Sequence, residues 1–270
     1  MLKAIIETAD FLRSLQTLNP EIGIILGTGL GGLVKEIEID TSISYSKIPN
    51  FPVSTVEGHQ GRLIFGRIKG KPVIAMQGRF HYYEGYNMQQ VTFPVRVMKQ
   101  MGIKTLVVSN ASGGLNPSFK VGDLMIIDDH INMFGNNPLI GPNLAEFGPR
   151  FPDMSEPYSK ELIARVHDIA AKEGIEVKQG VYVGTAGPTF ETPAEYKFFR
   201  IIGGDAVGIS TAPEVIVAHH SGLTCFGISI ITDSGVPGQI VEVSHEEVQK
   251  VASEAEPKMT KLIAELVGTL

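Results

Sequence analysis

An arginine and a histidine two positions apart are the first side chains in this sequence whose types and spacing suggest chemistry. Arg79 and His81 follow the apolar run 72–77, which is typical of a strand. At a strand end, residues two positions apart can point to the same side. The guanidinium group offers paired donors that match phosphate oxygens, and histidine adds a further donor. The pair is therefore a candidate anion site, although a surface arginine beside a packed histidine would show the same spacing.

Two glycine-bearing segments also follow apolar runs. Residues 27–32 (GTGLGG) follow the run 22–26, and residues 110–114 (NASGG) follow the run 105–109. Glycines let backbone amides converge on an anion without obstruction from side chains. Each segment fits either an anion-binding loop or a tight turn after a strand.

The first glycine segment also matches the dinucleotide-binding pattern G-x-G-x-x-G, with glycines at 27, 29 and 32. A dinucleotide site needs an acidic residue about 20 positions further on, to bind the ribose hydroxyls. Residues 47–52 (KIPNFP) contain none. A non-catalytic nucleotide-binding module of this type is therefore an alternative that the pattern supports only weakly.

Two carboxylates, Glu191 and Asp233, come at the ends of separate predicted strands or in the turns that follow. Ligands of open α/β sheets bind at that edge, although acids at loop starts are also common. The adjacent His219 and His220 cannot share a helix face as a metal-binding i, i+4 pair does. Cys225, the only cysteine, lies in an apolar run, where a thiol usually packs as a small hydrophobe. We expect no metal and no organic cofactor.

The elements that must position these residues alternate between strand and helix. Strands are expected at 22–26, 62–68, 72–77, 105–109, 123–127, 177–185, 205–209 and 224–232. Helices are expected near the N-terminus, at 88–101, at 159–173, and after the capping boxes Thr192/Glu195, Thr211/Glu214 and Ser244/Glu247. This order predicts an α/β fold: a single α/β/α domain over residues 1–270, with a central mixed β-sheet flanked by helices.

Charge and hydropathy exclude several classes of partner. The net charge is −6, with acidic and basic residues scattered along the chain, which argues against a nucleic-acid groove. No stretch approaches the roughly 18 apolar residues of a membrane span, and residues 1–18 lack the pattern of a signal peptide. We therefore expect a cytoplasmic protein that binds neither nucleic acid nor membrane. The irregular stretch 132–158, rich in Gly, Pro and Asn, is expected to be functional.

Taken together, the segments resemble the trimeric class of purine nucleoside phosphorylases over nearly the whole chain. The resemblance is carried by the order and spacing of residues 25–31, 57–61, 78–86, 110–114, 148–154, 187–192, 210–215 and 244–247. It implies a mixed sheet wrapped by helices, a homotrimer and a pentosyltransferase of purine salvage. Such an enzyme splits purine (deoxy)ribonucleosides into free base and (deoxy)ribose 1-phosphate, with inorganic phosphate as co-substrate and without a cofactor.

The resemblance also implies roles for individual residues. The residues expected at phosphate are Thr28, His59, Arg79, His81, Ala111 and Ser210. Those expected at the base and ribose are Tyr83, Phe190, Glu191, Val207, Ile209, Asp233 and His245. Of these, the catalytic candidates are His81, Glu191 and Asp233. Phe151 matches an aromatic residue that enters the site of the neighbouring subunit, which gives the irregular stretch 132–158 a purpose.

Asp233 departs from the family pattern, because members specific for 6-oxopurines carry asparagine there. An ionised aspartate has only acceptors, so it would repel O6 of a 6-oxopurine and bind a 6-amino group; protonated, it can serve either base. We therefore expect adenosine to be accepted alongside 6-oxopurine nucleosides, the alternative being an Asp233 that merely mimics asparagine. Methylthioadenosine phosphorylases share the aspartate and are the closest rival, but Glu191 and His245, which suits a 5′-hydroxyl, favour the purine nucleoside enzyme.

Overall fold

The computed structural model describes residues 1–27, 31–53 and 60–270. Within these ranges, one sheet of nine strands has the order β2-β3-β4-β1-β5-β8-β7-β6-β9. The strands are β1 (Ile22–Leu26), β2 (Glu38–Ser44), β3 (Arg62–Ile68), β4 (Lys71–Gln77), β5 (Thr105–Gly114), β6 (Leu124–Asn132), β7 (Val177–Gly184), β8 (Ala206–Gly208) and β9 (Thr224–Ser234). Parallel and antiparallel pairs both occur, so the sheet is mixed, as predicted.

One half of the sheet closes on itself. Strand β9 pairs with β6 and also with β5, so the five strands β5, β8, β7, β6 and β9 form a closed circuit. This half is a small barrel, which the sequence patterns did not predict. The barrel brings the carboxyl ends of β5 and β9 together, because these two strands run parallel from Thr105 and Thr224 onward.

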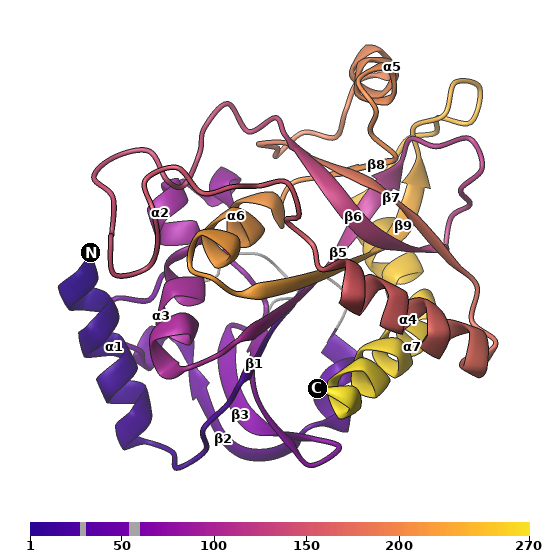
Figure 1. The fold of residues 1–270 in the computed structure, drawn as a ribbon. Helices are drawn as coiled ribbons and strands as arrows, with labels where there is room; N and C mark the ends of the chain where they lie inside the picture. Colours follow the sequence, from indigo (N-terminus) through magenta and orange to yellow (C-terminus); the bar gives the residue numbers. More distant parts are fainter. Residues whose placement is uncertain (28–30, 54–59) are drawn as a thin grey trace.

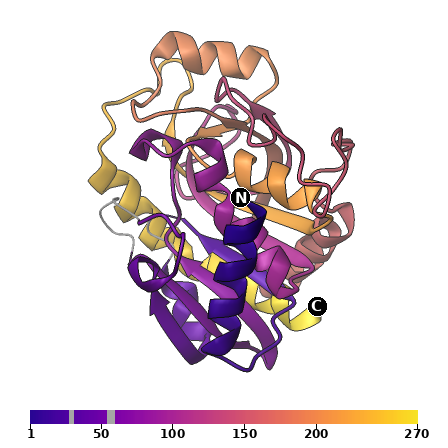
Figure 2. The ribbon, with the colours of Figure 1, turned by 90° about the vertical axis from the view of Figure 1, so that its left-hand side faces the viewer.

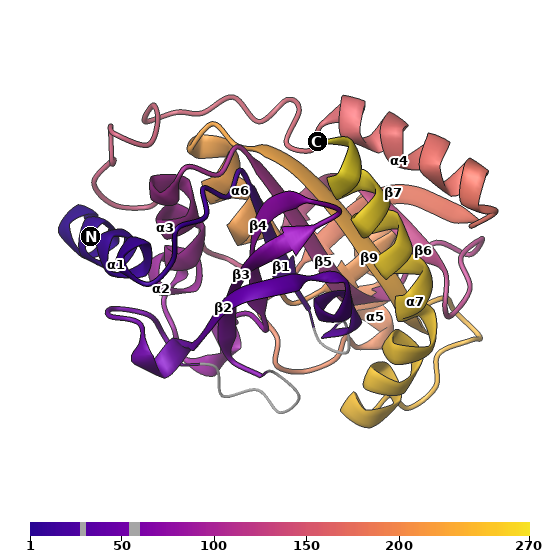
Figure 3. The same ribbon diagram turned by 90° about the horizontal axis from the view of Figure 1, so that it is seen from below.

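Helices flank the sheet on both sides, which confirms the predicted α/β fold. They are α1 (Leu2–Ser14), α2 (Met88–Val91), α3 (Phe93–Met101), α4 (Lys160–Glu173), α5 (Pro193–Ile201), α6 (Ala212–His220) and α7 (His245–Thr269). Helices α1, α3 and α6 pack in one layer, and α4 packs against α7 in another (Figures 1 and 3). Helix α5 projects from one end of the molecule (Figure 2). In the described part of the chain, no helix is long and apolar enough to cross a membrane.

Some elements differ from those expected. Residues 110–114, expected as a turn, are the second half of β5, because they pair with β9 and, at Gly113 and Gly114, with β8. The single helix expected at 88–101 is divided at Thr92 into α2 and α3, since Pro94 has no N–H to continue the ladder. Strand β2 was not expected, because it is a mostly exposed edge strand without an apolar run.

The three predicted capping boxes are present and begin α5, α6 and α7. In two of them the N-cap hydroxyl accepts the Glu N–H at 3.2 Å, from Glu195 to Thr192 and from Glu247 to Ser244. In the third, the Glu214 carboxylate accepts the Thr211 N–H at 2.9 Å. Each N-cap is next in sequence to a predicted site residue, namely Glu191, Ser210 or His245. The three helix starts therefore fix these side chains around one region.

Candidate active site

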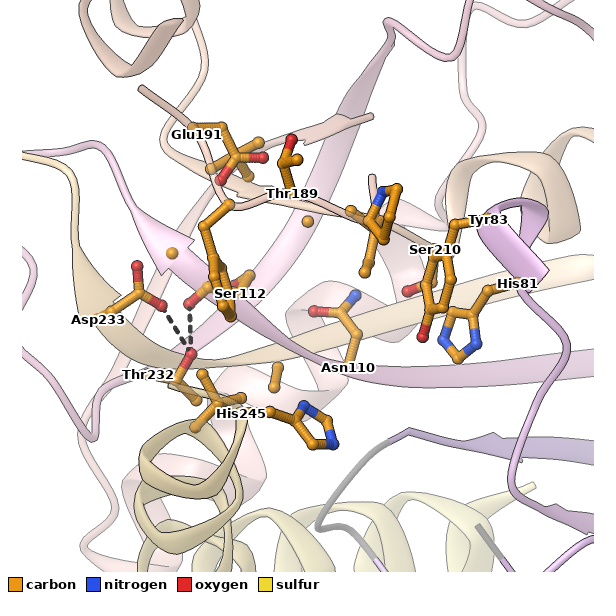
Figure 4. Close-up of a pocket in the computed structure, with 18 of the residues that line it drawn as sticks. His81, Tyr83, Asn110, Ser112, Thr189, Glu191, Ser210, Thr232, Asp233 and His245 are labelled. Carbon is orange, nitrogen blue, oxygen red and sulfur yellow. Dashed lines mark hydrogen bonds between the residues drawn. The ribbon is translucent and has the colours of Figure 1, made fainter. Parts of the chain in front are cut away.

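A cavity of about 500 Å³ lies where β5, β8 and β9 meet the segments after β4 and before α5 (Figure 4). Its volume suits a ligand the size of a nucleoside. All predicted site residues within the described ranges line it except Phe151, namely Arg79, His81, Tyr83, Ala111, Phe190, Glu191, Val207, Ile209, Ser210, Asp233 and His245. Thr28 and His59 lie outside the described residues. The cavity has two ends: Glu191 and Asp233 lie at one, and His81, Tyr83 and Ser210 at the other (Figure 4).

Arg79 is held rigidly at the second end of the cavity. Its side chain is 1 % exposed, and its Nε donates to the buried Glu214 carboxylate at 3.0 Å. Nη1 donates to the Ser109 carbonyl at 2.7 Å and lies 3.2 Å from Ser210 Oγ. The other Glu214 oxygen caps α6 through Thr211, so the ion pair ties the arginine to a helix start. A guanidinium fixed in this way presents a preorganised positive charge to an anion.

His81 is also buried and oriented by a carboxylate. Its Nδ1 lies 3.1 Å from Glu84 Oε1, which also accepts the His81 N–H at 2.7 Å. Because a carboxylate only accepts, Nδ1 carries the proton in this pair, and Nε2 of the neutral ring is an acceptor. Burial lowers the pKa of His81, while Glu84 opposes the shift. The ring stacks on Tyr83 with centroids 4.8 Å apart, so both residues sit as one unit on the cavity wall.

At the opposite end, two partly desolvated carboxylates face the cavity. Burial raises the pKa of Glu191, as does the nearby charge of Asp233. Thr185 Oγ1 donates to Glu191 at 3.3 Å. Burial also raises the pKa of Asp233, which is 8 % exposed, against the hydrogen bonds from Thr232 and Tyr196 that lower it. These two groups are the acids most suited to exchange a proton or a hydrogen bond with a ligand.

The lining of the cavity also includes apolar side chains and a histidine at a helix start. Val207, Ile209 and Phe190 supply apolar surface that suits the face of a purine ring. His245 is the first residue of α7, after the Ser244 cap, and its Nε2 lies 2.9 Å from Gln249 Nε2. The helix start therefore places an imidazole at the rim.

Several lining residues were not predicted individually. Asn110 is buried, donates to Thr211 at 2.8 Å and accepts from Ser229 at 2.7 Å. Ser112 Oγ is buried and finds no hydrogen-bond partner among the described residues. Thr232 donates to Asp233. Asn110 and Ser112 belong to the glycine segment 110–114, which was expected to be a turn but is part of β5. A turn and a strand direct their side chains differently, so the sequence pattern could not show which of these side chains face the cavity.

Phe151 lies elsewhere on the surface. Its side chain is 87 % exposed, beside a separate hollow of about 570 Å³. The Arg150 guanidinium lies 5.9 Å from its ring centroid and donates to the carbonyls of Leu139 and Gly141 at 3.0 and 2.8 Å. The segment therefore exposes the Phe151 side chain, and the Arg150 guanidinium lies close to its ring.

The fold and the cavity define a member of the phosphorylase superfamily, whose family model matches residues 21–268. The chain is 52 % identical to purine nucleoside phosphorylase 1 of Geobacillus stearothermophilus, over 99 % of this chain and 97 % of that protein. It is similar to two crystal structures of purine nucleoside phosphorylase, one from Schistosoma with hypoxanthine and one from Schistosoma mansoni with adenosine. Each has a TM-score of 0.95 and 42 % identity, and covers 100 % of this chain and 98 % of the other. The chain belongs to the purine nucleoside phosphorylases, which confirms the resemblance noted in its sequence.

Proposed function

We propose that residues 1–270 form one catalytic domain that cleaves purine nucleosides with inorganic phosphate. One cavity carries the proposal, because it has a fixed cation, Arg79, at one end and the buried Asp233 and half-buried Glu191 carboxylates at the other. A phosphate dianion matches the first end, and a nitrogen-rich base matches the second. The main hydrophobic cluster of the described residues contains side chains from Ile5 to Val267, which supports a single domain.

In the proposed reaction, an oxygen of phosphate bonds to the anomeric carbon of the ribose as the bond from that carbon to N9 of the purine breaks. The ribosyl group becomes cation-like and the base gathers negative charge, so the enzyme accelerates the reaction by stabilising both. Arg79 and Ser210, with the backbone at Ala111, hold the phosphate oxygens below the sugar, and His81 Nε2 accepts a hydrogen bond from the phosphate O–H. Thr28 and His59 are expected to join them. Glu191 and Asp233 meet the base, and His245 meets the ribose 5′-hydroxyl.

The first test is base release from inosine, adenosine and methylthioadenosine, with and without phosphate. We expect release from inosine and adenosine only when phosphate is present, together with formation of ribose 1-phosphate. Methylthioadenosine should be the poorest substrate, because the polar His245 does not favour a methylthio group. If base release from all three nucleosides does not depend on phosphate, the proposal is refuted.

We further propose that the enzyme accepts both 6-oxo- and 6-aminopurine nucleosides. Glu191 suits the N1 side of hypoxanthine or guanine, whereas Asp233 suits the 6-amino group of adenosine. The solved relatives from Schistosoma were captured with hypoxanthine and with adenosine, so this fold accommodates both kinds of base.

The working form is proposed to be a homotrimer in which Phe151 completes the neighbouring site. Its exposure supports this, because an 87 % exposed phenylalanine braced by Arg150 is poorly placed in an isolated subunit. We expect a trimer in sedimentation analysis, and Phe151→Ala should lower kcat/KM for inosine about tenfold, since burying a phenylalanine is worth about 1.5–3 kcal/mol.

Mixed trimers separate this role from a local defect. Phe151→Ala subunits keep an intact cavity, and Arg79→Lys subunits keep Phe151, so coexpression of the two should give a higher kcat/KM than either variant homotrimer alone. Phe198→Ala, which truncates another exposed phenylalanine, is the matched control and should leave activity unchanged. A fully active monomer would contradict the proposal.

A further inference from the structure

Hydroxyl groups from two different elements hold the carboxyl group of Asp233. Thr232, its neighbour on β9, donates to Oδ1 at 3.0 Å (Figure 4). Tyr196, on α5, donates to Oδ2 at 3.3 Å. Asp233 lines the cavity, whereas Tyr196 is 3 % exposed and is not among the described residues that line it. The Tyr196 hydroxyl therefore acts on a ligand at this end through Asp233, which accepts its hydrogen bond.

The tyrosine ring and the carboxyl group are both confined by glycine backbone. A Cβ atom at Gly235 would lie 2.4 Å from the Tyr196 ring, so the ring occupies space that only glycine leaves open. The ring also packs in a small apolar cluster with Leu115, Val183, Phe199 and Val207. A Cβ atom at Gly113 would lie 2.8 Å from Asp233 Oδ2. The carboxyl group is thus held between the backbone of β5 and the Tyr196 hydroxyl.

We propose that Tyr196 is a positioning residue that biases the enzyme toward 6-aminopurines by orienting Asp233 and stabilising its carboxylate. The inference rests on the proposed role of Asp233 at the base. With adenosine, the Asp233 proton moves to N7 while the electron pair of the glycosidic bond passes to the base. The carboxylate that remains accepts hydrogen bonds from N7–H and from the 6-amino group, and Tyr196 stabilises this anion by a charge-assisted bond. With inosine, the Asp233 carboxylate faces O6, which is also an acceptor, so no hydrogen bond forms there.

The surroundings of Asp233 give this role a pH signature. Two titratable groups interact with it, Tyr196 on α5 and Glu191 in the segment before α5. Burial, and next the charges of Asp233 and Glu191, raise the pKa of Tyr196, so Tyr196 remains a donor. Its hydrogen bond lowers the pKa of Asp233, which burial raises. Because adenosine cleavage uses protonated Asp233, activity falls as pH rises through that pKa, and loss of the hydroxyl moves the fall to higher pH.

The test compares kcat/KM for adenosine and for inosine in Tyr196→Phe, Asp233→Asn and the double variant. Tyr196→Phe keeps the ring that fills the space beside Gly235. We expect the adenosine-to-inosine ratio to fall about tenfold, as for loss of one hydrogen bond to a charged group. The decline of kcat/KM for adenosine at high pH should also move to higher pH. In the Asp233→Asn background, Tyr196→Phe should lower the ratio no further. The control Tyr158→Phe, which loses a buried hydroxyl beside His130, should leave the ratio unchanged.

The outcomes distinguish the two proposals. If Tyr196→Phe reduces both substrates equally without moving the pH profile, Tyr196 is only structural and the inference is overturned. If Asp233→Asn lowers the ratio but Tyr196→Phe does not, the role of Asp233 stands and that of Tyr196 fails. If Asp233→Asn leaves the ratio unchanged, both fail.

Discussion

Replacing Arg79 with lysine should raise the KM for phosphate at least a hundredfold and leave the KM for the nucleoside nearly unchanged. Lysine keeps a positive charge but loses the fork that contacts Glu214, Ser109 and Ser210 together. Each hydrogen bond to a charged group is worth about 1.5–3 kcal/mol, so two misplaced hydrogen bonds to phosphate account for this loss. The measurement is the initial rate against phosphate concentration at saturating inosine.

A second variant, Arg79→Ala, separates the contribution of Arg79 to stability from its contribution to phosphate binding. Arg79→Ala would leave Glu214 as an unpaired buried charge, at a cost of about 3–5 kcal/mol in unfolding free energy. Adding Glu214→Gln should restore much of the thermal stability but none of the phosphate affinity. Arg67→Lys, on the surface of β3, is the matched control. An equal loss of affinity for phosphate and nucleoside would count against the role of Arg79.

Asp233→Asn should lower the ratio of kcat/KM for adenosine over inosine tenfold or more. Asparagine can accept a hydrogen bond from N7–H and donate one to O6, which favours inosine, whereas aspartate favours the 6-amino group. A hydrogen bond of this kind is worth about 1–3 kcal/mol, so its loss with adenosine and its formation with inosine together exceed tenfold. Steady-state kinetics with both nucleosides measures the ratio directly.

The pH profile provides a second readout for this variant. Burial raises the pKa of Asp233, and adenosine cleavage needs its proton, so adenosine activity of the unmodified enzyme declines as pH rises through that pKa. The decline should be absent in Asp233→Asn, which has no proton to lose at this position. Asp10→Asn, an exposed carboxylate on α1, should change neither the ratio nor the profile. A ratio that does not fall would show that Asp233 does not set base preference.

Local signals in the sequence predicted much of the fold. The capping boxes and the β3–β4 hairpin depend on neighbouring residues, and both are found where expected. The second half of β5 depends instead on partners in β8 and β9, so its Gly, Asn and Ser residues suggested a turn. Closure of the barrel has the same origin, because no local pattern specifies which distant strands pair.

The same distinction between local and long-range signals applies to the residues of the cavity. Arg79, His81 and Asp233 could be named from their positions after strands and from the family resemblance. Their supporting partners could not, because Glu214 is 135 positions from Arg79 and Tyr196 is 37 positions from Asp233. These partners orient the charged groups and shift their pKa values, and they become visible only when the chain is folded.

The double pairing of β9 also determines when the cavity can form. Thr232 contacts the Ser112 carbonyl across a separation of 120 residues, and β9 lies in the last fifth of the chain. Closing so long a loop costs conformational entropy before the hydrogen bonds between β5 and β9 form and offset that cost. Strand pairings between residues so far apart in the sequence therefore slow folding. A chain emerging from the ribosome therefore carries β5 with its partner edge uncovered until β9 is synthesised. The binding cavity is completed late, and until then the uncovered edge of β5 is open to pairing with other chains.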